Sequence, residues 1–249
     1  MTKSLELLTD AQGRFRFAVV AAPMLCGFDA RLEDIHEFYR QLRAERVRHA
    51  FVLGPVIDVR EMRGDSRGSM RGQYARFFAD NWPRQPGIQT YYLKSSGPIR
   101  TEPAMKAAGR DDWTDLPGHW LRVRRVNTPA SLPLILVHLM AADFDHRRRQ
   151  LRRALDVDHV VAVFSGRRQP DVTWEGGGMV VSPGLFHGSA ELVEPVGGGI
   201  VEFVLTHAGA VEDSSFDFWD WNGTDLRRIE TGGEDVSNSI EYGAVAVAL

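Results

Sequence analysis

Hydrophobic positions in the first half of the chain alternate between strand-like runs and helical spacing. The apolar, β-branched segment 15–21 predicts a buried strand. Asp29 predicts a helix start, because its side chain can accept hydrogen bonds from free backbone N–H groups and apolar residues follow at helical spacing. Further strands are predicted over residues 49–53 and 88–93, with a helix over residues 68–82 between them. Strands separated by helices favour parallel pairing with right-handed crossovers.

The middle of the chain has a less regular pattern. Residues 100–118 predict a long loop or an irregular helix. Strands are predicted over residues 120–126, 134–139 and 160–164, and a helix over residues 143–155 separates the last two. This part therefore continues the alternation of strands and helices.

Short strands joined by glycine-rich turns follow, a pattern typical of antiparallel hairpins. Because no Pro/Ser-rich linker separates the two styles, residues 1–249 are predicted to form a single domain. Within it, residues 1–14 are predicted to be an N-terminal extension and residues 187–249 the C-terminal β-rich part. The short strands are predicted over residues 172–174, 179–182, 190–196, 199–206, 216–221 and 242–249.

Composition excludes several classes of protein. Hydrophobic residues make up 43% and charged residues 25% of the chain, which is ordinary for a globular domain and unlike disordered, collagen-like or coiled-coil sequences. The formal net charge of -3 gives no overall field that would recruit nucleic acid or a membrane. The single cysteine, Cys26, excludes an intramolecular disulfide. The apolar stretch 17–28 is too short to span a bilayer, and no signal-peptide pattern opens the chain, so we expect an intracellular, reducing location.

Arginine strongly outnumbers lysine. Only three of the 30 basic residues are lysines (Lys3, Lys94 and Lys106), which leaves 27 arginines. A GC-rich genome would explain most of this excess. A second explanation is that the planar donor groups of arginine serve an anion or an interface.

The loops that follow the predicted strands form an ordered set of short motifs. Glycine and proline recur in them, and Asp58 and His138 are their only metal-ligating acidic or imidazole side chains. In chain order the motifs are 22–24 (Ala-Pro-Met), 54–58 (Gly-Pro-Val-Ile-Asp), 95–98 (Ser-Ser-Gly-Pro), His138, 166–169 (Gly-Arg-Arg-Gln) and 182–184 (Ser-Pro-Gly).

This order of strands and loops resembles the calcineurin-like metallophosphoesterase superfamily, over residues 15–186. In that family the corresponding loops read Asp-x-His, Gly-Asp-x-x-Asp, Gly-Asn-His, His and Gly-His-x-His, often followed by Asn-Pro-Gly, and they hold two divalent metals that activate water. The resemblance implies an α/β fold, a metallophosphoesterase-like sandwich of two mixed β-sheets flanked by helices, with extra antiparallel strands at the C-terminus.

The same resemblance implies that most metal ligands are lost. One Asp and one His cannot hold a binuclear centre, and methionine and arginine are unsuited to hard divalent metals. We therefore expect no metal or other cofactor and no catalytic residue. The degenerate metal-site positions are Ala22, Met24, Pro55, Asp58, Ser96, Gly97, His138, Arg167 and Gln169.

Three basic side chains fall at these vacated positions. Arg167, Arg168 and Lys94 form a candidate anion site for a phosphate or carboxylate. Two alternatives stay open: Arg167 pairs with Asp58 and replaces the charge of the metals, or these residues are solvated loop residues.

Some members of the superfamily act within assemblies rather than as enzymes. The resemblance therefore implies a catalytically inactive protein that serves as a scaffold or binding subunit for protein partners. One alternative is a phosphoesterase with a reduced metal site at Asp58 and His138. Another is an anion- or nucleic-acid-binding protein that uses arginines in place of metals, either at the loops or along residues 147–153.

Overall fold

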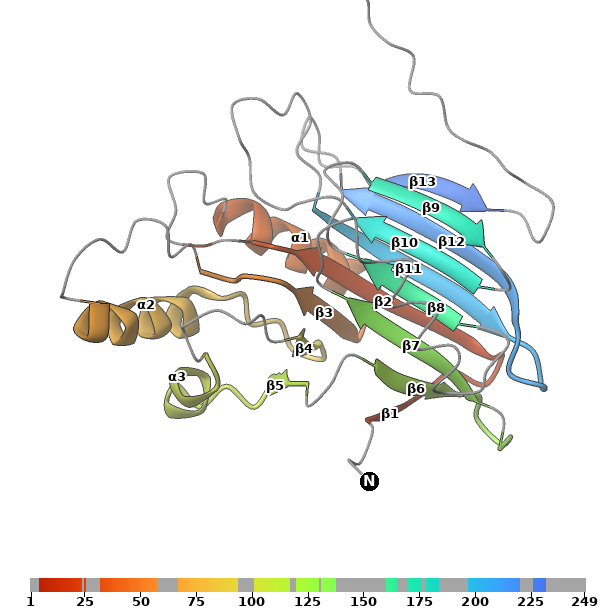
Figure 1. Ribbon diagram of the computed structural model, residues 1–249, viewed down its shortest axis with the longest axis horizontal. Helices are drawn as coiled ribbons and strands as arrows, with labels where there is room; N and C mark the ends of the chain where they lie inside the picture. Colours follow the sequence, from red (N-terminus) through yellow and green to blue (C-terminus); the bar gives the residue numbers. More distant parts are fainter. Residues whose placement is uncertain are drawn as a thin grey trace, which may run out of the picture.

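Two β-sheets pack face to face in this computed structural model, and helices cover the outer side of one of them (Figure 1). The structure describes residues 5–23, 25, 32–57, 67–93, 101–116, 120–129, 131–137, 160–164, 170–175, 178–183, 197–219 and 226–231. No helix within these ranges is long and apolar enough to cross a membrane.

The seven-stranded sheet joins a parallel half to an antiparallel half. Its strand order is β13-β12-β11-β2-β3-β4-β5, in which β2 to β5 pair in parallel and β11 to β13 pair antiparallel. Helices α1 (Leu32–Ala44), α2 (Arg67–Asn81) and α3 (Glu102–Ala107) lie between consecutive parallel strands, as parallel pairing requires. The strands are β2 (Arg14–Ala21), β3 (His49–Leu53), β4 (Gln89–Leu93), β5 (Trp113–Asp115), β11 (Gly198–Leu205), β12 (Val211–Trp219) and β13 (Leu226–Thr231).

The six-stranded sheet is also mixed. Its order is β1-β6-β7-β8-β10-β9, with β7, β8 and β10 parallel to one another, β1 parallel to β6, and antiparallel pairs β6–β7 and β9–β10. The strands are β1 (Glu6–Leu8), β6 (Trp120–Arg124), β7 (Ser131–Val137), β8 (Val160–Phe164), β9 (Pro170–Glu175) and β10 (Gly178–Pro183).

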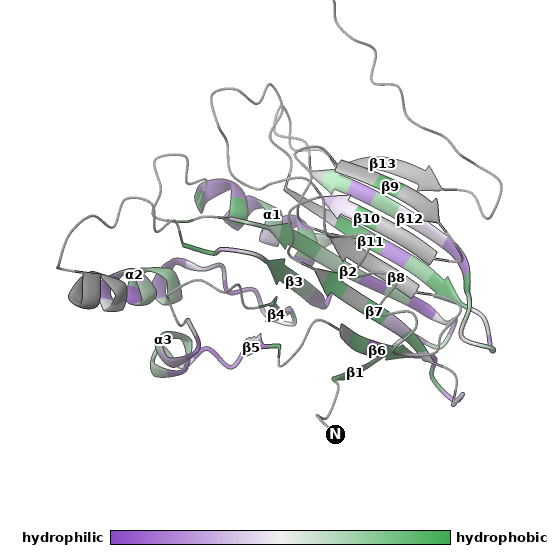
Figure 2. Ribbon diagram, in the orientation of Figure 1, coloured by the Kyte–Doolittle hydropathy of each residue, from purple (hydrophilic) through white to green (hydrophobic). Residues whose placement is uncertain are grey.

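An aromatic core fills the space between the sheets. Alternate residues of β2, such as Phe15 and Phe17, point toward the six-stranded sheet because side chains alternate along a strand. The rings of Phe17 and Phe51 meet edge to face with centroids 5.3 Å apart, and Phe203 of β11 lies against both Phe15 and Phe17. Hydrophobic residues are accordingly concentrated along β2, β3 and β6 (Figure 2). Burying each such ring contributes about 1.5–3 kcal/mol.

A second core lies between the seven-stranded sheet and its helices. The intervening β2 residues Ala18 and Val20 belong to it, as do Phe38 and Leu42, which recur at helical spacing on the buried face of α1. Hydrophilic and hydrophobic residues alternate around α1 in Figure 2, as expected for a helix with one buried face. The fold is thus layered as helices, sheet and sheet within the described part of the chain.

Most of the predicted elements that can be checked are confirmed. Strand 49–53 and strand 160–164 have the predicted bounds. The predicted strand 15–21 differs from β2 by one residue at its start, and the predicted helix 68–82 differs from α2 by one residue at each end. The prediction for residues 100–118 was incomplete, because this segment contains α3 and β5. Strands β1 and β13 were not predicted. The helix 143–155 and the strands 190–196 and 242–249 lie outside the described residues.

Candidate functional site

The parallel strands of both sheets end at one side of the sandwich, here named the carboxyl edge. In the seven-stranded sheet, β2, β3 and β4 run in the same direction and end there at Ala21, Leu53 and Leu93. The opposite side, where these strands begin at Arg14, His49 and Gln89, is the amino edge. Ligands of open parallel sheets bind outside the carboxyl ends of the strands, so the carboxyl edge is the candidate site.

A side-chain contact fixes how the second sheet is aligned with the first. Arg125, which lies between β6 and β7, donates a hydrogen bond to the carbonyl of Leu205, at the end of β11. The neighbouring Val204 pairs with Arg14, so this contact lies at the amino edge. Strand β7 therefore begins at the amino edge. Strands β7, β8 and β10 all run from that edge, so all three end at the carboxyl edge (Figure 1).

Backbone hydrogen bonds join the two loops at the centre of the carboxyl edge. The N–H of Ala22 donates to the carbonyl of Leu53 at 2.7 Å, and the N–H of Leu25 donates to the carbonyl of Val56 at 2.8 Å. Leu25 and Ile57 also form a parallel bridge. The pairing of β2 with β3 thus resumes beyond the turns that follow the two strands.

Both turns use the left-handed backbone region. Gly54 has φ +85°, which glycine adopts at no steric cost, but Ala22 has φ +48°. A non-glycine residue in this region costs about 1–2 kcal/mol. The tight turn after β2 is therefore maintained at an energetic cost, which the hydrogen bonds to β3 and its loop offset.

The described residues of these loops do not fit a two-metal centre. Such a centre requires converging oxygen and imidazole donors, and the side chains of Ala22 and Pro55 have none. Ala22 is 3% exposed, and the residues that follow in the two loops, Leu25, Val56 and Ile57, are apolar and buried. Buried apolar side chains therefore fill this part of the carboxyl edge.

The structure places two of the predicted site positions and leaves the others undescribed. Ala22 and Pro55 lie on neighbouring loops, as the sequence predicts for residues that follow adjacent strands. No group of three or more His, Cys, Asp or Glu that could hold a metal ion occurs among the residues with described positions. The predicted positions outside the described residues are Met24, Asp58, Lys94, Ser96, Gly97, His138, Arg167, Arg168 and Gln169.

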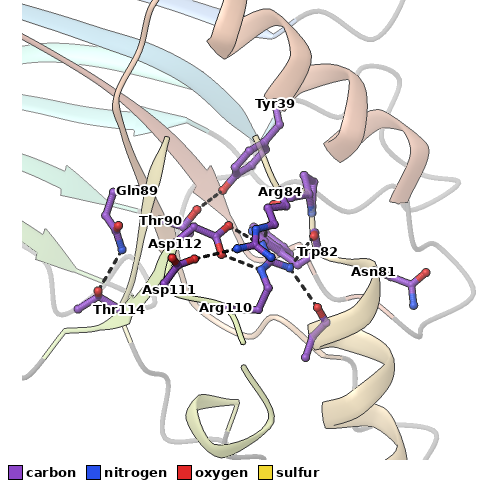
Figure 3. Close-up of polar contacts among 12 residues, drawn as sticks. Tyr39, Asn81, Trp82, Arg84, Gln89, Thr90, Arg110, Asp111, Asp112 and Thr114 are labelled. Carbon is purple, nitrogen blue, oxygen red and sulfur yellow. Dashed lines mark hydrogen bonds and ion pairs between the residues drawn. The ribbon is translucent and has the colours of Figure 1, made fainter. Parts of the chain in front are cut away.

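Arg110 forms the main polar cluster of the amino edge (Figure 3). Its guanidinium donates to both carboxylate oxygens of Asp112, at 2.8 and 2.7 Å. It also donates to the carbonyls of Ala79, Trp82 and Pro83, at 3.0, 2.8 and 2.9 Å, which lie at the C-terminal end of α2 or just after it. All five donors of this buried side chain are used, so Arg110 closes the end of α2.

The end of α1 is closed by an arginine in a similar way. Arg16 of β2 donates to the carbonyl of Glu45 at 2.8 Å and to its carboxylate at 2.9 Å. Its side chain also lies 3.5 Å from the carboxylate of Glu202 on β11. An arginine at a helix C-terminus interacts favourably with the helix dipole. Helices α1 and α2 thus both end on arginine side chains supplied by other parts of the chain.

His49 is a buried titratable group at the amino edge. Its ring stacks on Phe15 with centroids 5.5 Å apart and lies 5.9 Å from the ring of Tyr91. Its Nδ1 atom is buried without a hydrogen-bond partner. Burial, together with the neighbouring positive charge of Arg48, lowers the pKa of His49 to about 4. The imidazole is therefore neutral at pH 7.

No local sequence pattern indicates these amino-edge contacts. Arg110 and its carbonyl partners are 27 to 31 residues apart, and the Arg125–Leu205 pair is 80 residues apart. Neither spacing belongs to a local motif. His49 was recognised only as the start of a strand.

Comparison with known proteins finds similarity only at the level of structure. No protein-family model and no curated protein matches the sequence. GAP50 of Plasmodium, described as the anchor in the inner membrane complex, is 10% identical, and the match covers 87% of this chain and 88% of GAP50 with a TM-score of 0.50. Vps29 of Chaetomium thermophilum is 12% identical over 90% of this chain and 100% of Vps29, with a TM-score of 0.45. A predicted phosphoesterase of Streptococcus pneumoniae is 14% identical over 88% of this chain and 98% of its own, with a TM-score of 0.44.

The likeness concerns the fold alone. Vps29 and the predicted phosphoesterase are members of the calcineurin-like metallophosphoesterase superfamily. The GAP50 match and the sheet order agree with the predicted α/β sandwich of two mixed sheets flanked by helices, with antiparallel strands toward the C-terminus. The fold predicted from the sequence is therefore confirmed.

Proposed function

We propose that this protein has lost the metal-dependent hydrolysis of its fold and acts as a binding or scaffold subunit of a larger protein assembly. The observation that carries the proposal is the closed pair of loops after β2 and β3. Two residues without donor atoms, Ala22 and Pro55, stand where the fold requires metal ligands, and the hydrogen bond from Leu25 to Val56 holds the loops together.

The remaining loop sequences support the same proposal. Asp58 and His138 are two ligands at most, and Met24, Gly97 and Gln169 are poor ligands for hard divalent metals. Arg167, Arg168 and Lys94 then bind an anionic group, a phosphate or carboxylate, where the fold otherwise places metals. GAP50, described as the anchor in the inner membrane complex of Plasmodium, has a similar fold, and this supports a binding role over a catalytic one.

Metal analysis and a hydrolysis assay test the loss of activity. The protein is loaded with Mn²⁺ or Zn²⁺, freed of excess metal and analysed for bound metal, and turnover of bis(p-nitrophenyl) phosphate is measured. We expect less than one metal ion per chain and no turnover above buffer. His138→Ala is compared with His207→Ala, a histidine after β11 that lies outside the loops concerned. Stoichiometric metal with turnover lost only in His138→Ala would establish the reduced-site phosphoesterase instead.

A binding assay tests the role of the arginines. Binding of inorganic phosphate, nucleotides and short oligonucleotides is measured at low salt for the natural protein and for Arg167→Ala and Arg168→Ala. Weaker binding in both variants supports the anion site. If none of these anions binds the natural protein at low salt, the anion-site part of the proposal is wrong. The proposal of a scaffold then depends on a partner that co-purifies with the native protein at fixed stoichiometry.

A further inference from the structure

Three exposed arginines lie close together in the sequence, one in the last turn of α1 and two in the turn that leads to β3. Arg43, Arg46 and Arg48, here named the basic turn, occupy six consecutive positions at the amino edge, on the opposite side from the carboxyl edge. None of the three side chains forms an ion pair with another residue of the described part of the chain. The basic turn is therefore a surface where positive charge is not compensated locally.

Two backbone hydrogen bonds hold the basic turn. The N–H of Val47 donates to the carbonyl of Leu42 at 2.9 Å, and the N–H of Arg46 donates to the carbonyl of Arg43 at 3.1 Å. This is the Schellman pattern of a helix C-terminus, and the burial of both Leu42 and Val47 supplies its usual hydrophobic contact. The basic turn therefore presents its side chains from a fixed frame.

Arg46 occupies the position of this pattern that favours glycine. Its φ is +57°, in the left-handed region where a side chain is strained. Glycine would relieve the strain, yet a charged side chain is present. Residues held in such conformations are often found at functional sites. We therefore take Arg46 as a candidate binding residue, because an arginine here does not serve the stability of the turn.

Nearby carboxylates already have arginine partners. Glu37 pairs with Arg40, and Glu45 pairs with Arg16 at 2.9 Å. Farther along the same edge, Asp111 pairs with Arg84 at 2.9 Å (Figure 3). The basic turn is thus left for an external anion.

A groove lies beside the basic turn. The N–H of Gln89 donates to the carbonyl of Arg48 at 2.8 Å, so the start of β4 lies next to the basic turn. Gln89 also lines a cavity of about 610 Å³, whose other walls are residues 84–88 and the two aspartates at 111 and 112. Five uncharged residues form much of this wall: Gln85, Pro86, Gly87, Ile88 and Gln89. Such a groove suits an extended peptide.

We propose that the basic turn, with the adjacent groove, binds an acidic, extended segment of a partner protein. Carboxylates of the segment would pair with the three arginines, and its main chain would continue along residues 84–89. A peptide is favoured over nucleic acid because the large exposed hydrophobic side chains of the described residues are only Leu8 and Phe77, which offer no series of stacking platforms. This second surface is independent of the function proposed for the carboxyl edge.

A peptide titration tests the proposal. The probe is a fluorescein-labelled peptide of ten residues in which glutamate and serine alternate, and binding is followed by anisotropy at low salt. We expect each of Arg43→Gln, Arg46→Gly and Arg48→Gln to weaken binding about threefold, and the triple variant about thirtyfold. Arg76→Gln, which removes the same charge from the middle of α2, is the matched control and should change binding less than twofold.

Arg46→Gly separates a binding role from a structural one. Because glycine relieves the left-handed strain, this variant should unfold at a higher temperature while binding the peptide more weakly. Weaker binding with a raised unfolding temperature supports the proposal. Unchanged peptide binding in Arg46→Gly and in the triple variant would overturn it. So would equal or tighter binding of a twelve-nucleotide single strand, or of phosphatidylserine vesicles, with the same dependence on the three arginines.

Discussion

Different interactions hold the loops at the carboxyl edge and at the amino edge of the sandwich. At the carboxyl edge, backbone hydrogen bonds join the loops after β2 and β3, and the side chains beside them are apolar. At the amino edge, arginine side chains donate hydrogen bonds to the carbonyls at the ends of α1 and α2, and Arg125 bridges the two sheets. Backbone hydrogen bonds and apolar packing therefore stabilise the described loops of the carboxyl edge, and charged side chains stabilise those of the amino edge.

This difference is the reverse of what the fold uses for hydrolysis. A two-metal phosphoesterase gathers charged and imidazole groups at its carboxyl edge. Here the described loop residues at that edge are uncharged. The ion pairs of Arg16 with Glu45 and of Arg110 with Asp112 lie at the amino edge. Substitutions at the two edges should consequently differ in their dependence on pH, salt and metal ions.

The largest expected effect comes from Arg110 at the amino edge. Arg110→Met should lower the free energy of unfolding by about 3–5 kcal/mol, because it leaves the mostly buried carboxylate of Asp112 and the carbonyls at the end of α2 without partners. Urea denaturation measures the loss. Arg84→Met removes the exposed neighbouring ion pair and should cost less than about 1 kcal/mol. Similar losses in both variants would contradict the special role of Arg110.

At the carboxyl edge, Ala22→Asp restores a carboxylate to the site. We expect a loss of about 2–4 kcal/mol, because the side chain at this position is buried and the described neighbours offer no cation. Unfolding is measured with EDTA and with excess Mn²⁺, and the metal should not recover the loss. Recovery by Mn²⁺ would show that metal ligands persist near this position and would contradict the proposed function. Ala44→Asp, at an exposed position near the end of α1, controls for the added charge.

His49 makes the amino edge sensitive to acid. Its folded-state pKa of about 4 lies below the ordinary value of 6.5, so the unfolded chain binds a proton at higher pH than the folded one. Above pH 6.5, protonation of His49 takes nothing from the free energy of unfolding. As the pH falls from 6.5 toward 4, it lowers the free energy of unfolding by about 3 kcal/mol in total. His49→Phe keeps the ring stack and should remove this part of the loss. Urea midpoints measured from pH 7 to 4 test this. An identical pH profile in the variant would refute the assignment.

The smallest effect concerns the link between the two sheets. Gly13 has φ +88°, and a Cβ there would lie 2.6 Å from the carbonyl oxygen of Leu205 and 2.9 Å from Nη1 of Arg125. Gly13→Ala should therefore cost about 2 kcal/mol. Gly87→Ala, which also has a positive φ but open space around its Cβ, separates backbone strain from the clash. Thermal unfolding measures both, and an equal loss would show that the clash contributes nothing.

The sequence predicted the fold better than it predicted the contacts at the edges. Strands such as 49–53 are long apolar runs whose pattern is set by burial, so they are visible locally. Strands β1 and β5 contain three residues each, too few to show a period, and β13 carries three charged residues. These strands depend on pairing with neighbours that are distant in the sequence.

The candidate site was predictable in position but not in geometry. Adjacent parallel strands must end at the same edge, which placed Ala22 near Pro55 from the sequence alone. The bond between Leu25 and Val56 depends on how the two turns are oriented, and no local pattern specifies that. The role of Arg110 was invisible for the same reason, since its partners assemble only when α2 has packed on the sheet.

Arg110 also determines how α2 can move. Sliding the helix along its axis by one turn, about 5.4 Å, would separate the guanidinium from the carbonyls of Ala79 and Trp82 together. The end of α2 at the amino edge is thereby anchored against translation. The hydrogen bonds of Arg110 therefore set the position of α2 along its own axis.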